Sequence, residues 1–427
     1  MEKARYVVGF DLNDLVSQIS YFELNTNAPV TVSSDTDDKR LGIPTVLSKR
    51  KNVSQWYFGS EAQKVVKKGE GTLIGKLLSF ARAGAKIELE GEVYDSLDLL
   101  ILFVRRALDL IEVAVGPDDI GQLIFTVDTL EGRSIEVFNK LASQLSIPRD
   151  RIFFQTYDES IYYYTIHQPG ELWKHDVCVF DYSNDCLKSH VLWMNRHTRP
   201  VVGFVDSVEY SEIKMPSVML EGEDKEEKSK RLDEMILQRV QELFSGRTFS
   251  TVYLVGDGFS KEWCDKTVKF MCSGRRVFQG QNLYSKGACY CGADRMKPGS
   301  LNEEYIFLGH DKLKANTGLR IMDRGEEEYV VLVDAGETWY ESSASIEFIL
   351  ESGDEVPVTV TPLDGSKARD EMIKLPGLPS RPDKATRLRL NAEFLSDSKM
   401  EVTVRDLGFG EFYPASGKEW KRVIDLI

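Results

Sequence analysis

The chain has 427 residues, of which 42% are hydrophobic and 10% aromatic, and its formal net charge is −14. This length and composition predict two or three globular domains rather than a disordered chain. The negative charge, with no basic stripe along the sequence, argues against binding to nucleic acid or to an anionic membrane surface.

The first 300 residues show apolar patterns typical of strands that alternate with helices. Strands are expected at residues 6–11, 16–24, 44–47, 121–127, 152–156, 177–181, 187–193 and 251–255. Helices are expected near residues 60–68, 95–115, 132–145, 158–167, 221–246 and from 260 onwards, with a turn at residues 56–59. This alternation predicts an α/β domain.

After about residue 300 the helical spacing ends and short strand-like runs take over. They lie at residues 319–322, 329–333, 345–350, 356–361, 386–394 and 400–405, separated by turn residues. Such a pattern is typical of an all-β sandwich. We therefore expect an α/β domain at residues 1–302, an apolar linker at residues 303–312 and a β-sandwich domain at residues 313–427.

Three features of the sequence predict a cytoplasmic protein without a membrane span. The first five residues lead directly into a strand, so no signal peptide is expected. The most apolar helix, at residues 97–115, carries five charged residues, which a bilayer would not tolerate. The six cysteines form neither a metal-ligand pattern nor a disulfide framework, so we expect reduced thiols and no metal site.

Three predicted strands end in short turns of the kind that present backbone N–H groups to a phosphate. Such turns usually carry glycine, but here they carry Asp14, Asp185 and Asp257. A carboxylate about 4 Å from a phosphate oxygen costs on the order of 4 kcal/mol at an effective dielectric constant near 20. That is roughly a thousandfold in affinity. The alternative is that these aspartates cap their turns, a role for which aspartate is favoured.

The order of these turns, followed by the β domain, resembles the seventy-kilodalton heat-shock chaperones of the DnaK type. The family's phosphate loops, Asp-Leu-Gly-Thr-Thr and Asp-Leu-Gly-Gly-Gly-Thr, are similar to DLNDL at residues 11–15 and DYSNDC at residues 181–186. Its Asn-Glu-Pro helix start and Gly-Gly-Ser turn are similar to DES at residues 158–160 and GDG at residues 256–258. Its Ala-Ile-Gly-Ala run resembles SKGA at residues 285–288, and LPGLP at residues 375–379 resembles the peptide-binding sandwich.

This resemblance implies an actin-like ATPase domain followed by a peptide-binding sandwich, without the family's helical lid before residue 427. The implied catalytic residues are Asp11, Lys76, Glu159 and Asp181. The implied nucleotide-binding residues are Asn13, Asp14, Leu15, Ser183, Asn184, Asp185, Gly256, Asp257 and Gly258. The implied peptide-binding residues are Leu319, Ile321, Met322, Phe348 and Val358.

The family inserts a large adenine-clamping subdomain where this chain has only about seventy residues, 186–255. The helix at residues 221–246 is either a remnant of that clamp or a connecting helix. Together with the aspartates, this predicts a chaperone-like protein that holds an extended polypeptide or a dedicated protein partner and has weak or lost ATP binding. The alternatives are a working ATPase that uses ATP or ADP with magnesium, and an actin-like scaffold.

Overall fold

The computed structural model describes residues 6–26, 28–33, 41–51, 53, 55–112, 114–130, 132–183, 185–220, 224–259, 263–280, 282–309, 312–323, 326–337, 339 and 342–427. The chain divides into two compact units. The first unit contains residues 1–194 and 204–303, and the second contains residues 195–203 and 304–427.

Two large sheets of the first unit share one topology. The order of the first sheet is β11 (Ile152–Thr156), β10 (Ile120–Val127), β1 (Tyr6–Asp11), β2 (Val16–Glu23) and β3 (Val30–Thr31), with β4 (Ile43–Pro44) also paired to β2. The order of the second sheet is β16 (Arg276–Gly280), β15 (Phe249–Val255), β12 (Asp176–Asp181), β13 (Cys186–Asn195) and β14 (Val201–Lys214).

The pairings show that the two sheets are equivalent. Strand β1 is parallel to β10 and antiparallel to β2, just as β12 is parallel to β15 and antiparallel to β13. The central strands are continuous apolar runs that are almost fully buried, as expected for strands covered on both faces. In each sheet the first strand along the chain, β1 or β12, ends with an aspartate, and a tight turn follows it.

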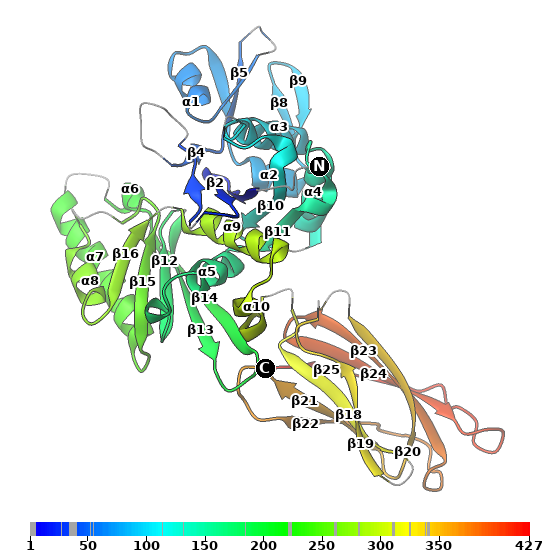
Figure 1. Cartoon of the computed structure of the whole chain (residues 1–427). Helices are drawn as coiled ribbons and strands as arrows, with labels where there is room; N and C mark the ends of the chain where they lie inside the picture. Colours follow the sequence, from blue (N-terminus) through cyan, green and yellow to red (C-terminus); the bar gives the residue numbers. More distant parts are fainter. Residues whose placement is uncertain are drawn as a thin grey trace. The chain divides into compact units, whose positions relative to one another are not determined.

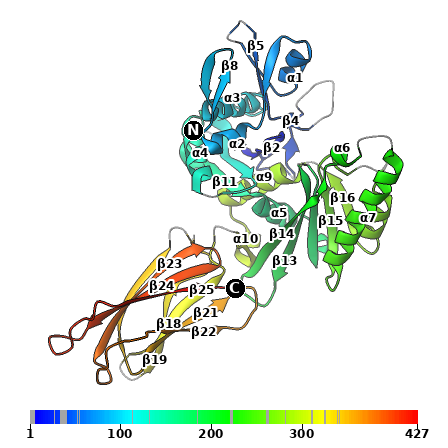
Figure 2. The ribbon, with the colours of Figure 1, turned by 180° about the vertical axis from the view of Figure 1, so that it is seen from behind.

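Two helices, α5 (Tyr157–Ile166) and α9 (Leu283–Met296), pack against each other between the large sheets (Figures 1 and 2). Helix α5 follows β11 and α9 follows β16, so the helices are equivalent as well. A capping box starts α5, in which Thr156 accepts a hydrogen bond from the N–H of Glu159 and the Glu159 carboxylate accepts one from the N–H of Thr156. Close packing of α9 places Gly287 against the backbone of Ser160, where a larger residue would clash.

The remaining helices and small sheets of the first unit surround this centre. The helices are α1 (Gly59–Lys67), α2 (Leu77–Ala83), α3 (Ser96–Asp109), α4 (Gly132–Ser143), α6 (Pro216–Met219), α7 (Lys225–Phe244), α8 (Asp265–Met271) and α10 (Ser300–Glu304). The small sheets combine β5 (Leu47–Arg50) with β6 (Trp56–Phe58) and β7 (Gly71–Ile74), and β8 (Lys86–Leu89) with β9 (Glu92–Asp95). Helices α7 and α8 cover the outer face of the second large sheet, because the apolar stripe of α7 packs on that sheet (Figure 1).

The second unit consists of two antiparallel sheets that share one apolar core. One sheet has the order β19 (Glu326–Val333), β18 (Ala315–Asp323), β21 (Glu355–Pro362) and β22 (Arg369–Lys374). The other has the order β20 (Ser343–Leu350), β23 (Thr386–Ser396), β24 (Lys399–Gly408) and β25 (Glu419–Asp425). Burial alternates along β23 and β24, as it does when one face of a sheet is packed and the other is solvated.

The predicted change from an α/β part to a β-rich part is confirmed. The strand predicted at residues 44–47 is divided between β4 and β5, and two further local predictions also differ from the structure. Residues 56–58, predicted as a turn, form β6 because their backbone pairs with β5. Within the predicted linker, β17 (Tyr305–Phe307) pairs in parallel with residues Val201–Gly203 of β14. This apolar run is therefore the last strand of the sheet that contains β14.

Candidate functional site

Two buried aspartates occupy equivalent places at the ends of β1 and β12. Asp11 is 5% exposed and Asp181 is 4% exposed. The hydroxyl of Tyr157, the first residue of α5, donates to Asp11 Oδ1 at 3.0 Å. The hydroxyl of Tyr284, near the start of α9, donates to Asp181 Oδ2 at 2.7 Å. The duplicated topology therefore brings one tyrosine from each central helix to one carboxylate of each sheet.

The protonation state of Asp11 follows from its burial. Burial raises the pKa of Asp11 to about 8, the hydrogen bonds from Tyr157 and Asn13 lower it, and the charge of Asp181 raises it. Burial also raises the pKa of Tyr157 well above its ordinary value, so its hydroxyl remains a donor. Burial therefore favours the neutral form of the Asp11 carboxyl.

The first turn uses its own N–H groups. Asn13 Oδ1 accepts hydrogen bonds from the N–H groups of Leu15 and Val16, both at 2.9 Å, and Asn13 Nδ2 donates to the carbonyl oxygen of Val16 at 2.7 Å. This is a self-contained Asx turn. Two backbone donors of this turn, the N–H groups of Leu15 and Val16, are therefore bonded to the Asn13 side chain.

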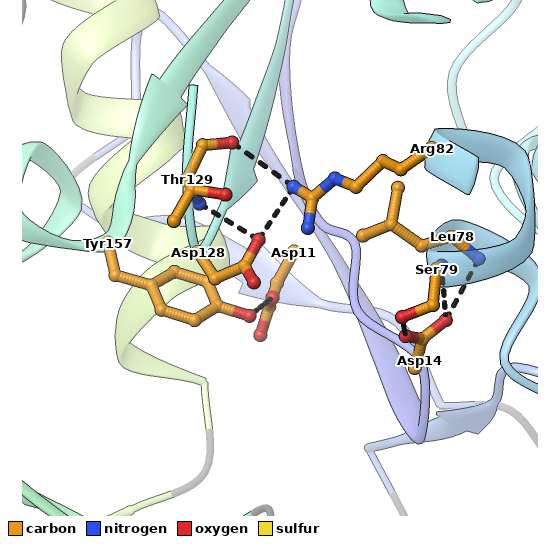
Figure 3. A network of polar contacts seen from close by, with 8 residues as sticks. All are labelled: Asp11, Asp14, Leu78, Ser79, Arg82, Asp128, Thr129 and Tyr157. Atoms are coloured by element: carbon orange, nitrogen blue, oxygen red, sulfur yellow. Dashed lines mark hydrogen bonds and ion pairs between the residues drawn. The ribbon is translucent and has the colours of Figure 1, made fainter. Parts of the chain in front are cut away.

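Asp14 has a specific partner outside its turn. Its Oδ1 atom accepts hydrogen bonds from the N–H groups of Leu78, at 2.9 Å, and Ser79, at 3.1 Å, and the Ser79 hydroxyl donates to its Oδ2 atom (Figure 3). These N–H groups belong to the first turn of α2 and have no partner within the helix. Asp14 thus caps α2 from a distance of more than sixty residues along the chain, and its carboxylate is the anion at this position.

A second polar group lies beside this cap. Arg82, on α2, donates from Nη2 to Asp128 Oδ1 at 2.7 Å and to the carbonyl oxygen of Thr129 at 3.1 Å (Figure 3). Asp128 Oδ1 also accepts the N–H of Thr129 at 2.8 Å. Because Asp128 follows the buried strand β10, this pair ties α2 to the first sheet.

The second turn is closed in a similar way. Asp181 Oδ1 accepts the N–H of Ser183 at 3.0 Å, and the Ser183 hydroxyl donates to the same oxygen. The N–H of Tyr182 donates to the carbonyl oxygen of Val255 at 2.8 Å. Asp185 is exposed at the tip of the turn, and Asn184 lies outside the described residues.

The third turn packs directly onto the second. Gly258 donates its N–H to the carbonyl oxygen of Tyr182 at 2.9 Å. A Cβ atom on Gly258 would lie 2.4 Å from Tyr182 Cγ, and one on Gly256 (φ +94°) would lie 2.5 Å from the N atom of Ser183. These glycines permit close contact with the protein itself, while Asp257 is exposed beside them.

The Tyr182 ring occupies space that a glycine-rich loop would leave open. Its side chain is fully buried, packs edge-on against Phe259 and Trp263, and donates its hydroxyl to the carbonyl oxygen of Lys214. A tyrosine at this position therefore makes the second turn part of the hydrophobic core.

A cavity of about 270 Å³ adjoins the first and second turns, and its lining carries both signs of charge. The carboxylates in the lining are Asp14, Asp128, Asp181 and Asp185, and the cations are Lys76, Arg82 and Lys188. Arg82 is paired with Asp128, and Lys188 Nζ lies 3.0 Å from Glu209 Oε2. From the sequence we expected the negative charges of the aspartates to dominate this site. The structure shows that three cations line the cavity as well, so its net charge is less negative than expected.

The implied catalytic residues do not form one cluster. Lys76 and Asp181 line the cavity, whereas Asp11 does not line it and is hydrogen-bonded to Tyr157 and Asn13, which do. Glu159 belongs to the capping box of α5. Among the described residues, no group of three or more His, Cys, Asp or Glu side chains is arranged to hold a metal ion.

The implied peptide-binding residues have different environments in the second unit. Leu319 and Val358 point into the shared core and are 3% and 0% exposed. Ile321 and Phe348 are partly buried against that core. Met322 points to the opposite side of β18 and is 58% exposed. Period-two alternation separates Met322 from Leu319 and Ile321, so these side chains do not line one surface.

Sequence reasoning missed Tyr157, Tyr284, Arg82 and Asp128. Asp128 could have been found, because it follows a buried apolar strand in the same way as Asp11 and Asp181. The two tyrosines carry no comparable local signal, since each reaches its carboxylate across more than one hundred residues of chain.

The fold and the closed turns define a class: a duplicated α/β unit with a polar cavity, followed by an all-β unit. Residues 28–310 match the family of unknown function DUF5716, C-terminal part, and residues 312–426 match the domain of unknown function DUF8552. The first match covers more than half of the chain, so the chain belongs to the DUF5716 family. No curated protein matches it. Within the described residues, none of the helices combines the length and apolar character needed to cross a bilayer.

Proposed function

We propose that this protein is a chaperone-like member of the actin-like ATPase class that holds an extended polypeptide or a dedicated protein partner without binding ATP. The duplicated topology supports the actin-like assignment. It gives two equivalent strand–turn–strand elements, each with an aspartate at the end of its first strand. The described cysteines form no disulfide, which supports a cytoplasmic location.

The observation that carries this proposal is the capping of α2 by Asp14. A nucleotide phosphate at this place would compete with a tethered carboxylate that already bonds the N–H groups of Leu78 and Ser79. The carboxylate is held by the fold, so a phosphate would have to displace it and then bear its repulsion. Asn13 and Asp181 use the N–H groups of their own turns in the same way.

A working ATPase is the second candidate, and one observation favours it. Lys76, Arg82 and Lys188 all line the cavity, so three cations lie where a polyphosphate would need them. Two of these cations are paired with carboxylates, which offsets their attraction for an anion. We favour the holding function for this reason.

A peptide-binding assay separates the two functions. Fluorescence anisotropy would measure the affinity of the purified full chain for a library of labelled extended peptides, with and without magnesium and ATP. The holding function predicts binding of some peptides with an affinity that nucleotide does not change. A change of about tenfold with nucleotide, as expected for coupled sites, would support the ATPase instead. Failure to retain any peptide or partner would refute the holding function.

A further inference from the structure

A second pocket lies at the carboxyl ends of β15 and β16, away from the turns described above. Its volume is about 250 Å³, and it shares no lining residue with the cavity beside Asp14. Its walls come from α5, the turn that follows α5, the two strands and the start of α9. All of these elements belong to the first unit. The carboxyl ends of strands in open α/β sheets are a common place for ligands to bind.

Three aromatic rings form the apolar part of this pocket. Tyr164 and Tyr253 meet edge to face, with ring centroids 5.5 Å apart and planes at 85°. Tyr253 and Phe278 are stacked, with centroids 5.6 Å apart. Phe278 is 41% exposed, so part of this residue remains accessible to a further ring. Aromatic rings favour such stacked and edge-to-face partners.

Three amide side chains form the polar part. Gln168 donates from Nε2 to the carbonyl oxygen of Tyr164 at 3.0 Å. Gln279 donates from Nε2 to the carbonyl oxygen of Phe259 at 3.1 Å. Asn282 donates from Nδ2 to Thr31 Oγ1 at 2.9 Å. Each amide nitrogen thus has a protein partner, and the amide oxygens are acceptors for an incoming N–H or O–H group.

The size and charge of the pocket limit its occupant. All of its lining residues are uncharged, so a charged group entering it would lose hydration without gaining an ionic partner. Small-molecule sites usually measure about 300–1,000 Å³, and this pocket is smaller. One bulky aromatic side chain with a hydrogen-bond donor matches both the volume and the amide acceptors.

The neighbouring strand provides the means to hold such a side chain. In the described part of the chain, β16 is the last strand of its sheet, so one edge of its backbone faces outward. An edge strand can pair with an extended segment of another chain, with the side chains of that segment filling adjacent pockets. We propose that β16 and this pocket bind an extended segment of a partner protein, with a tryptophan of that segment inserted between Phe278 and the amides.

This proposal does not depend on whether the Asp14 cavity binds nucleotide, because the two sites share no residue. The first test uses the full chain and the probe 5-fluoroindole, observed by fluorine NMR line broadening. Saturable broadening is expected. Methylation of the ring nitrogen should weaken binding about fivefold, since it removes the donor to the amide oxygens. No saturable broadening, or equal binding of the methylated probe, would refute the assigned chemistry.

Substitutions localise the binding. Phe278→Ala removes the exposed aromatic face and should weaken 5-fluoroindole binding about tenfold. Phe412→Ala is the matched control, because Phe412 is 92% exposed and belongs to the second unit. Circular dichroism confirms that both variants are folded. Equal affinity in the Phe278 variant would place the probe elsewhere and overturn the proposal.

A short peptide tests the edge strand. The acetylated, amidated peptide Val-Thr-Trp-Thr-Val should displace 5-fluoroindole and bind at least about tenfold more tightly, because its backbone can pair with β16. The same peptide with leucine in place of tryptophan should bind far more weakly. If the tryptophan peptide does not compete with the probe, the pocket does not act as an anchor beside the edge strand.

Discussion

The rings of Tyr157 and Tyr284 are stacked, with centroids 4.1 Å apart, and each hydroxyl donates to a different buried aspartate. One tyrosine starts α5 and the other lies in the first turn of α9, so the pair links the two equivalent halves of the first unit. The contact places two carboxyl groups, Asp11 and Asp181, close enough for the charge of one to raise the pKa of the other. The two stacked tyrosines and the two aspartates that accept their hydroxyl groups therefore form one hydrogen-bonded cluster at the centre of the first unit.

The stability of the protein should depend on the protonation of Asp11. Its pKa is raised to about 8 in the folded protein, from about 3.8 when unperturbed. Between these values the folded state keeps a proton that the unfolded state releases, so Asp11 contributes stability that is lost as pH rises from about 4 to about 8. Asp11→Asn removes this titration. The free energy of unfolding of the variant, measured with urea, should therefore improve relative to wild type as pH rises.

Asp185→Asn is the control for this measurement, because Asp185 lies exposed on the equivalent turn. Wild type and Asp11→Asn share every titrating group except Asp11, so the difference between their free energies of unfolding isolates the contribution of Asp11. Parallel stability curves for wild type and Asp11→Asn across this pH range would show that Asp11 is ionised at neutral pH.

Removing the Asp14 carboxylate should uncap α2. Asp14→Ala leaves the N–H groups of Leu78 and Ser79 without their acceptor, which should cost about 1 kcal/mol of folding stability. Urea denaturation measures the change. Asp185→Ala, on the second turn, should change stability by less than about 0.5 kcal/mol. Equal effects of the two substitutions would contradict the capping role.

The second unit should depend on a buried ion pair. Arg381 donates from Nη1 and Nη2 to the two carboxylate oxygens of Asp406, both at 2.7 Å, and the side chains are 4% and 0% exposed. Arg381→Met leaves a buried carboxylate without its cation and should destabilise this unit by about 3–5 kcal/mol. The control Arg389→Met breaks an exposed pair with Glu347 and should cost less than about 1 kcal/mol. Thermal unfolding of the full chain, followed by calorimetry, would distinguish these outcomes.

The central strands and the long helices could be predicted because their signals are local. β1, β10, β12 and β15 are continuous apolar runs, and α7 shows a regular apolar stripe at Leu232, Ile236 and Val240. Helix α9 was not predicted as a separate helix, since small and polar residues of the helix such as Ser285 are themselves buried. A helix buried on most sides shows no amphipathic period.

The candidate site was predicted only in part, for a physical reason. The positions of Asp11 and Asp181 follow from the ends of apolar strands, which the sequence shows. The partner of Asp14 does not, because Lys76, the residue before α2, has a left-handed backbone (φ 54°) that the sequence does not indicate. The sequence therefore left open whether Asp14 repels a phosphate or caps its own turn, whereas the structure shows its carboxylate bonded to the N–H groups of Leu78 and Ser79 in α2.

The most direct test of the central claim, that the closed turns do not bind ATP, is calorimetric titration of the purified chain with ATP and magnesium. Asn13 and Asp181 bond N–H groups of their own turns, and Asp14 bonds the first N–H groups of α2. We therefore predict no heat of binding at nucleotide concentrations up to about 1 mM, which corresponds to about 4 kcal/mol of binding free energy. A dissociation constant in the micromolar range would show that the turns open to a phosphate, and would contradict the account.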